Sequence, residues 1–117
     1  MSTPLLTLPL TATLRDAVHL FHTHHIHGAP VLKDDGSLAG IITLSDLARG
    51  LDEGLTLDTL VAEVMTRDVI EAPPSIQLYD LVGRFKEREI GRLIVVEEGK
   101  PIGIITQTDI IRVFPSL

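Results

Sequence analysis

A short segment that could bind the sugar of a nucleotide occurs twice in this 117-residue sequence. Gly40-Ile-Ile-Thr43-Leu-Ser-Asp46 returns, 63 residues further on, as Gly103-Ile-Ile-Thr106-Gln-Thr-Asp109. A carboxylate only accepts hydrogen bonds, so the aspartate of each copy could accept one from both hydroxyls of a ribose. The glycine has no side chain, so a ligand could approach the backbone closely there. The segment is therefore a candidate ribose site.

The same residue types also fit a purely structural role. In a helix capping box, the threonine hydroxyl accepts a hydrogen bond from a backbone N–H, and the acid three residues later lies favourably against the helix dipole. Thr13-Leu-Arg-Asp16 matches that pattern without the preceding glycine and isoleucines. A single copy is as compatible with a cap as with a ligand site. The repeated motif is expected at the carboxyl end of a strand that enters a helix, where free N–H groups face outward.

Similarity between the two halves extends beyond this motif. Leu14 matches Leu78 and Val31 matches Val95 at an offset of 64 residues, one more than the offset between the glycines. The change of register falls in an acidic turn that ends in glycine, where a hairpin tolerates a one-residue difference. The sequence therefore predicts two copies of one supersecondary unit.

Each copy is predicted to form a strand, a helix, two strands joined by a turn, and a second helix. The first-copy ranges are Leu5-Leu6, 13–24, 30–32, 38–43 and 45–51, and the second-copy ranges are 69–72, 75–88, 92–96, 101–106 and 109–114. A short linking helix is expected over 57–64. Neither copy, at about 60 residues, buries its sheet face alone. We therefore expect an α/β (α+β) fold of two β-α-β-β-α repeats, 1–53 and 54–117, packed with pseudo-twofold symmetry.

The composition argues against several classes of function. The longest apolar runs are far shorter than the ~20 residues of a membrane-spanning helix. A net charge of −6, 3% aromatic residues and no Trp do not fit a nucleic-acid binder, which needs basic patches and stacking rings. The chain has no Cys and no N-terminal signal-peptide pattern. We therefore expect a cytoplasmic protein without disulfides or thiolate metal sites.

The whole chain resembles a tandem pair of CBS domains, also called a Bateman module. The resemblance rests on Ile26-His-Gly-Ala-Pro-Val31, on the segment from Asp35 to Leu47, and on their second-copy partners. Residues 61–70 look like the lead-in that commonly precedes a repeat of this family. The resemblance implies a non-catalytic, energy-sensing module that binds AMP, ADP, ATP or S-adenosylmethionine in two clefts between the repeats. It also implies a homodimer that passes ligand occupancy to an effector protein.

Site residues follow from the same resemblance. One cleft would combine Thr43, Asp46, Val69, Ile70 and Arg92, and the other would combine Leu5, Leu6, His27, Thr106 and Asp109. Arg92 offers a planar charged fork to a phosphate, whereas the matching position of the first copy is Gly28. We therefore expect the cleft with Asp46 to bind nucleotides better. The net negative charge argues mildly against a triphosphate that lacks Mg²⁺.

Two other functions remain compatible with the sequence. A repeat pair could serve only as a dimerisation scaffold, although the retention of Asp46 and Asp109 favours sensing. All five histidines lie between His19 and His27, and imidazoles three residues apart on a helix could hold a divalent metal. A short His-rich tract is, however, more compatible with adventitious binding than with a functional metal site. No nucleophile with a positioned base is evident, so we expect no catalysis.

Overall fold

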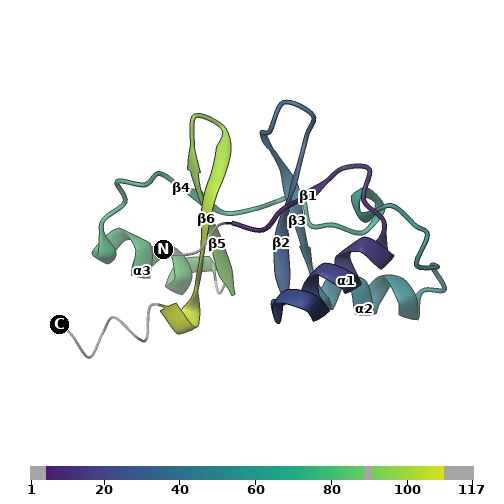
Figure 1. Ribbon diagram of the computed structural model, residues 1–117. Coiled ribbons are helices and arrows are strands. Elements are labelled where there is room, and N and C mark those ends of the chain that lie inside the picture. Colours follow the sequence, from purple (N-terminus) through teal and green to yellow (C-terminus); the bar gives the residue numbers. More distant parts are fainter. Residues whose placement is uncertain (1–4, 89–90, 110–117) are drawn as a thin grey trace. The chain divides into compact units, whose positions relative to one another are not determined.

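The computed structural model describes residues 5–88 and 91–109, and the chain divides into two compact units. Leu6–Asp68 form one, named here the Asp46 unit, and the other, the Asp109 unit, takes up Val69–Leu117 and Met1–Leu5. Each unit contains a three-stranded sheet with helical segments around it (Figure 1). The predicted mixed fold of helices and sheets is confirmed in both.

The sheet of the Asp46 unit joins residues from both sides of a helix. Strand β1 (Leu8–Pro9) runs parallel to β2 (Gly28–Leu32), and β2 pairs antiparallel with β3 (Leu38–Thr43). Between the last two strands, the hydroxyl and the N–H of Ser37 donate to the carboxylate of Asp35, at 2.5 and 2.9 Å. These bonds stabilise the charged form and lower the pKa of Asp35.

One helix separates β1 from β2 in the sequence, and a second helix follows β3. Helix α1 (Leu14–His24) begins at a complete capping box, in which Thr13 and Asp16 exchange hydrogen bonds of 2.9 and 3.2 Å. Leu14, Ala17 and Phe21 on its apolar face are buried, and Leu14 is fully enclosed. Helix α2 (Leu44–Asp52) follows β3 without a loop. This direct junction fixes the position of the first Thr-x-x-Asp motif.

The segment after α2 packs back onto the Asp46 unit. The N–H of Leu14 donates to the carbonyl of Thr59 at 2.8 Å, and that of Arg15 to the carbonyl of Leu57 at 2.9 Å. Because residues 57–60 pair with the start of α1, the predicted linking helix shrinks to one 3₁₀ turn, η1 (Val61–Glu63). The first compact unit thus extends through Asp68, well into the second sequence repeat.

The Asp109 unit repeats the same order of elements. Strand β4 (Glu71–Ala72) runs parallel to β5 (Arg92–Glu97), which pairs antiparallel with β6 (Lys100–Thr106). Helix α3 (Leu78–Arg88) connects the first two strands in sequence. The two-residue turn at Glu98 and Gly99 has positive φ at both positions, the conformation that suits the right-handed twist of a hairpin.

Three sequence-based boundaries are wrong. The strand predicted at Leu5-Leu6 lies at Leu8–Pro9, that predicted over 69–72 contracts to Glu71–Ala72, and the helix predicted from residue 75 begins at Leu78. A two-residue strand has no periodicity of its own, so its place depends on which residue meets the partner strand, as Leu8 meets Val31. The closing helix predicted over 109–114 lies outside the described residues beyond Asp109.

No helix in the described part of the chain has both the length and the apolar character needed to cross a membrane.

Candidate functional site

Both repeated Thr-x-x-Asp motifs lie where a strand enters a helical turn. In the Asp46 unit, the N–H of Thr43 donates to Asp46 Oδ2 at 3.0 Å, and the N–H of Asp46 donates to Thr43 Oγ1 at 3.2 Å. In the Asp109 unit, the corresponding distances between Thr106 and Asp109 are 2.8 and 3.3 Å. The capping role is therefore present in both copies. Capping uses Oδ2 of each aspartate, so Oδ1 takes no part in the cap.

The two aspartates differ in burial and in their partners. Asp46 is 2% exposed, whereas Asp109 is exposed. Arg49 Nη2 donates to Asp46 Oδ1 at 2.9 Å, and Thr66 Oγ1 lies 3.2 Å from Oδ1 and 3.4 Å from Oδ2. Among the residues that the structure describes, only Thr106 donates to Asp109. The same motif is thus enclosed in one unit and open in the other.

Gly40 faces the chain's own backbone. A Cβ at this position would meet the carbonyl oxygen of Thr66 at 2.6 Å and the sulfur of Met65 at 3.1 Å. Ile41 and Thr66 exchange two backbone hydrogen bonds, at 2.8 and 2.9 Å, which hold the segment there. The close approach expected of a ligand at Gly40 is therefore made by the segment that follows η1.

The remaining predicted residues lie beside one of the two motifs or precede, in the sequence, the first strand of a sheet. Arg92 stands directly opposite Thr106 in the β5–β6 ladder, and Gly28, which follows His27, stands opposite Thr43 in the β2–β3 ladder. Residues directly opposite each other project from the same face of a sheet. Half-buried residues precede each first strand: Leu5 and Leu6 before β1, and Val69 and Ile70 before β4. The predicted combinations of residues from both units stay predictions.

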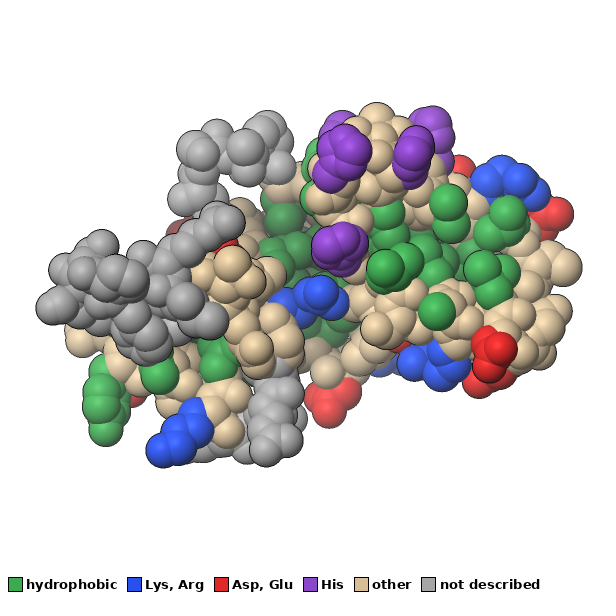
Figure 2. All heavy atoms as spheres, turned by 90° about the horizontal axis from the view of Figure 1, so that it is seen from below, with side chains coloured by type: hydrophobic (Ala, Val, Ile, Leu, Met, Phe, Trp, Pro, Cys, Tyr) green, Lys and Arg blue, Asp and Glu red, His purple; other side chains and the backbone are tan. Residues whose placement is uncertain are grey.

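The histidines gather on the surface around α1 (Figure 2). All five are exposed, and His25 ends the helix with a φ of 54°. A shallow pocket of about 380 Å³ beside them is lined mainly by apolar side chains: Val18, Phe21, His22, His25, Ile26, His27, Leu44 and Leu47. Within 5–88 and 91–109, no group of three or more His, Cys, Asp or Glu could hold a metal ion. The geometry therefore gives no support to the metal-sensor hypothesis.

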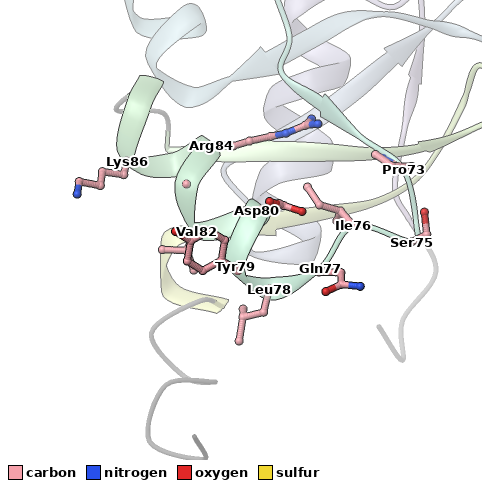
Figure 3. Close-up of a pocket in the computed structure, with 11 residues that line it drawn as sticks. Pro73, Ser75, Ile76, Gln77, Leu78, Tyr79, Asp80, Val82, Arg84 and Lys86 are labelled. Atoms are coloured by element: carbon pink, nitrogen blue, oxygen red, sulfur yellow. The ribbon is translucent and has the colours of Figure 1, made fainter.

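A larger hollow of about 1220 Å³ runs along α3 (Figure 3). It is lined by Pro73, Ser75, Ile76, Gln77, Leu78, Tyr79, Asp80, Val82, Gly83, Arg84 and Lys86, none of which belongs to the predicted site. The guanidinium of Arg84 already donates to the carbonyl of Glu71, and Tyr79 is 89% exposed. Size alone does not make this hollow a ligand site, because it contains neither Thr-x-x-Asp motif.

Sequence reasoning missed two residues that the structure brings to the motif. Arg49 lies three residues after Asp46 on α2, and the same spacing recurs from Asp109 to Arg112, which lies outside the described residues. That recurrence was a usable signal. Thr66 gave none, because its contact with Asp46 spans 20 positions and depends on how the chain returns after α2.

Comparison with known proteins finds matches for nearly the whole chain. A family model described as CBS domain matches residues 1–53 and again 61–116. An uncharacterized protein of Methanocaldococcus jannaschii is 39% identical over 108 residues, which cover 92% of this chain and 35% of that protein. The chain therefore spans about a third of the length of this curated relative.

Solved structures with the same fold include complexes with adenosine compounds. A CBS domain pair solved with 5′-methylthioadenosine and S-adenosyl-L-methionine has a TM-score of 0.87 and 28% identity, covering 99% of this chain and 92% of that one. A protein named CBSX2, solved with AMP, has a TM-score of 0.84 and 28% identity, covering 97% and 92%.

Proposed function

The chain belongs to the CBS domain family, and on that basis we propose that it is a non-catalytic regulatory module that binds an adenosine-containing ligand. One observation carries the proposal: both units place a Thr-x-x-Asp motif where a strand enters a helical turn. The ligands in the two solved relatives share an adenosine portion. Its ribose is the part that an acceptor-only carboxylate suits best.

The aspartates would bind the ribose of the ligand, and an arginine would bind its phosphate. In the Asp109 unit, Oδ2 takes the capping bonds, so the free capacity of the exposed carboxylate can accept from two neighbouring ribose hydroxyls. Arg92, half-buried at the start of β5, is the predicted phosphate partner, because a guanidinium offers two parallel donors. We retain two residue sets as the proposed sites: Thr43, Asp46, Val69, Ile70 and Arg92, and Leu5, Leu6, His27, Thr106 and Asp109.

Ligand binding can regulate another protein only if it changes a contact that the module makes with that protein. We propose that the module is a cytoplasmic homodimer and that its ligand alters contacts with an effector protein or with another part of a longer chain. A ligand can shift such an equilibrium only by the difference between its affinities for the two states. The effector would therefore recognise the liganded and free forms differently.

Thermal unfolding with a panel of ligands tests this proposal. AMP, ADP, ATP, S-adenosylmethionine and NAD are each added to the purified chain. A ligand present at about 100 times its dissociation constant stabilises the native state by about 2.7 kcal/mol, which corresponds to a shift of several degrees. We expect at least one adenosine compound to raise the midpoint in this way.

Variants then locate the sites. Asp46→Ala and Asp109→Ala, alone and together, should reduce the shift, and the double variant should abolish it. Arg92→Met should weaken AMP more than adenosine, because only AMP carries the phosphate. If no compound in the panel moves the midpoint while the chain still dimerises, the scaffold function replaces the sensing function.

A further inference from the structure

The carboxylate of Asp46 is fully engaged before any ligand arrives. A carboxylate offers about four acceptor positions. Oδ2 accepts from the N–H and the hydroxyl of Thr43, both at 3.0 Å, while Oδ1 accepts from Arg49 at 2.9 Å. The hydroxyl of Thr66 bridges both oxygens at 3.2 and 3.4 Å. Two ribose hydroxyls therefore find no free acceptor position at Asp46.

We propose that Thr66 and Arg49 determine how tightly Asp46 binds a ribose, because they occupy the oxygens that the ribose hydroxyls would use. This inference rests on the proposed function. It makes both side chains positioning residues of the Asp46 site: they act through the carboxylate. In the Asp109 unit, no described residue plays either part.

Thr66 is held against Asp46 by its own backbone. Its N–H and carbonyl pair with Ile41 on β3, and Gly40 provides the space in which the Thr66 carbonyl lies. The Thr66 hydroxyl is thus positioned by a backbone whose N–H and carbonyl are both hydrogen-bonded. This arrangement keeps the hydroxyl close to the carboxylate in the absence of a ligand.

Of the two donors, Thr66 is the one that a ribose can replace. Removing a cation from a buried carboxylate leaves an uncompensated charge, which is strongly unfavourable. Arg49 also donates to the carbonyl of Val64 at 3.2 Å, so two contacts hold it. Thr66 is neutral and exposed, and rotation about one side-chain bond releases its hydroxyl. A ribose hydroxyl can then take the vacated position while Arg49 continues to neutralise Asp46.

Calorimetric titration with AMP tests the competition. An Asp109→Ala background confines binding to the Asp46 site. Thr66→Val keeps the shape of the side chain and removes the hydroxyl, whereas Thr66→Ser keeps the hydroxyl. We expect Thr66→Val to lower the dissociation constant for AMP about tenfold, in line with the strength of one hydrogen bond to a charged group. Thr66→Ser should stay close to the parent, and Thr66→Ala should shift in the same direction as valine.

The matched control places Thr66→Val in an Asp46→Ala background, where AMP bound through Asp109 should keep its affinity. If AMP binds in the Asp109→Ala background but Thr66→Val leaves its affinity unchanged or weakens it, the inference is wrong and the proposed function stands. If AMP binds no variant and not the parent chain either, and the other adenosine compounds also fail, both are overturned together.

Discussion

The Asp46 unit and the Asp109 unit carry the same motif on the same kind of sheet, yet their aspartates have opposite surroundings. Both aspartates cap a helical turn through nearly identical hydrogen bonds. Within the described residues, only Asp46 is also covered, by Arg49 and by the segment that contains Thr66. Local sequence fixes the cap, and a distant segment decides whether the carboxylate remains available.

This difference bears on which site binds nucleotide better. The sequence favoured Asp46, because the family resemblance assigns Arg92 to its cleft. In the structure, Arg92 lies opposite Thr106 in the other unit's own sheet, and Asp46 is already occupied. The AMP affinities of Asp46→Ala and Asp109→Ala, measured side by side, establish the order of the two sites.

Removal of each carboxylate should produce the largest difference in stability between the units. We expect Asp46→Ala to lower the free energy of unfolding by about 3 kcal/mol, because it removes a cap and the buried carboxylate that accepts hydrogen bonds from Arg49 and Thr66. Asp109→Ala loses the cap and should cost about 1 kcal/mol. Urea denaturation of both variants measures the difference. Equal losses would mean that the contacts of Asp46 with Arg49 and Thr66 contribute nothing to folding.

Gly40→Ala probes the segment that covers Asp46. The new methyl group would lie 2.6 Å from the carbonyl oxygen of Thr66, so the segment must move, at a cost of about 2 kcal/mol. Gly83→Ala is the control in the Asp109 unit. This position lies on α3, where the new Cβ would meet no atom within 4 Å beyond its chain neighbours and its own helix backbone, so the substitution should stabilise the helix by up to about 1 kcal/mol. Thermal unfolding of the two variants should shift in opposite directions.

Substitution of the capping threonines should destabilise the two units equally. Thr43→Ala and Thr106→Ala each remove one cap, and we expect both to lower the free energy of unfolding by about 1 kcal/mol. Urea denaturation checks the pair. A much larger loss at Thr43 would show that the hydroxyl also supports the arrangement of Arg49 and Thr66 around Asp46.

The smallest expected effect concerns the two hairpins. Asp35 accepts two hydrogen bonds from Ser37, which lower its pKa below the ordinary range. Because the folded pKa lies below the unfolded one, these bonds contribute stability above the unfolded pKa and lose it as the pH falls through the folded pKa. Ser37→Ala should raise the pKa of Asp35, as measured by NMR titration. The other hairpin turns at Glu98 and Gly99, away from Ser37, so Ser37→Ala should leave it unchanged.

Much of the fold was accessible from the sequence because its signals are local. The repeat predicted helices over 13–24 and 75–88, close to α1 and α3, and glycine-containing acidic turns marked both hairpins. The short strands β1 and β4 were misplaced or too long, because two residues carry no pattern. The linking helix over 57–64 was wrong, because backbone pairing with α1 outcompeted helix formation there.

For the candidate site, the sequence by itself determined which residues carry the chemistry: two threonine–aspartate pairs at helix starts, repeated at a fixed interval. Hydrogen bonds over three residues depend only on the local backbone, so the sequence sufficed. Only the tertiary structure decided that Asp46 is enclosed and that the backbone of Thr66, rather than a ligand, lies against Gly40. Both outcomes depend on where residues 64–66 return to β3, and such a return is set by packing between distant segments, which no local pattern encodes.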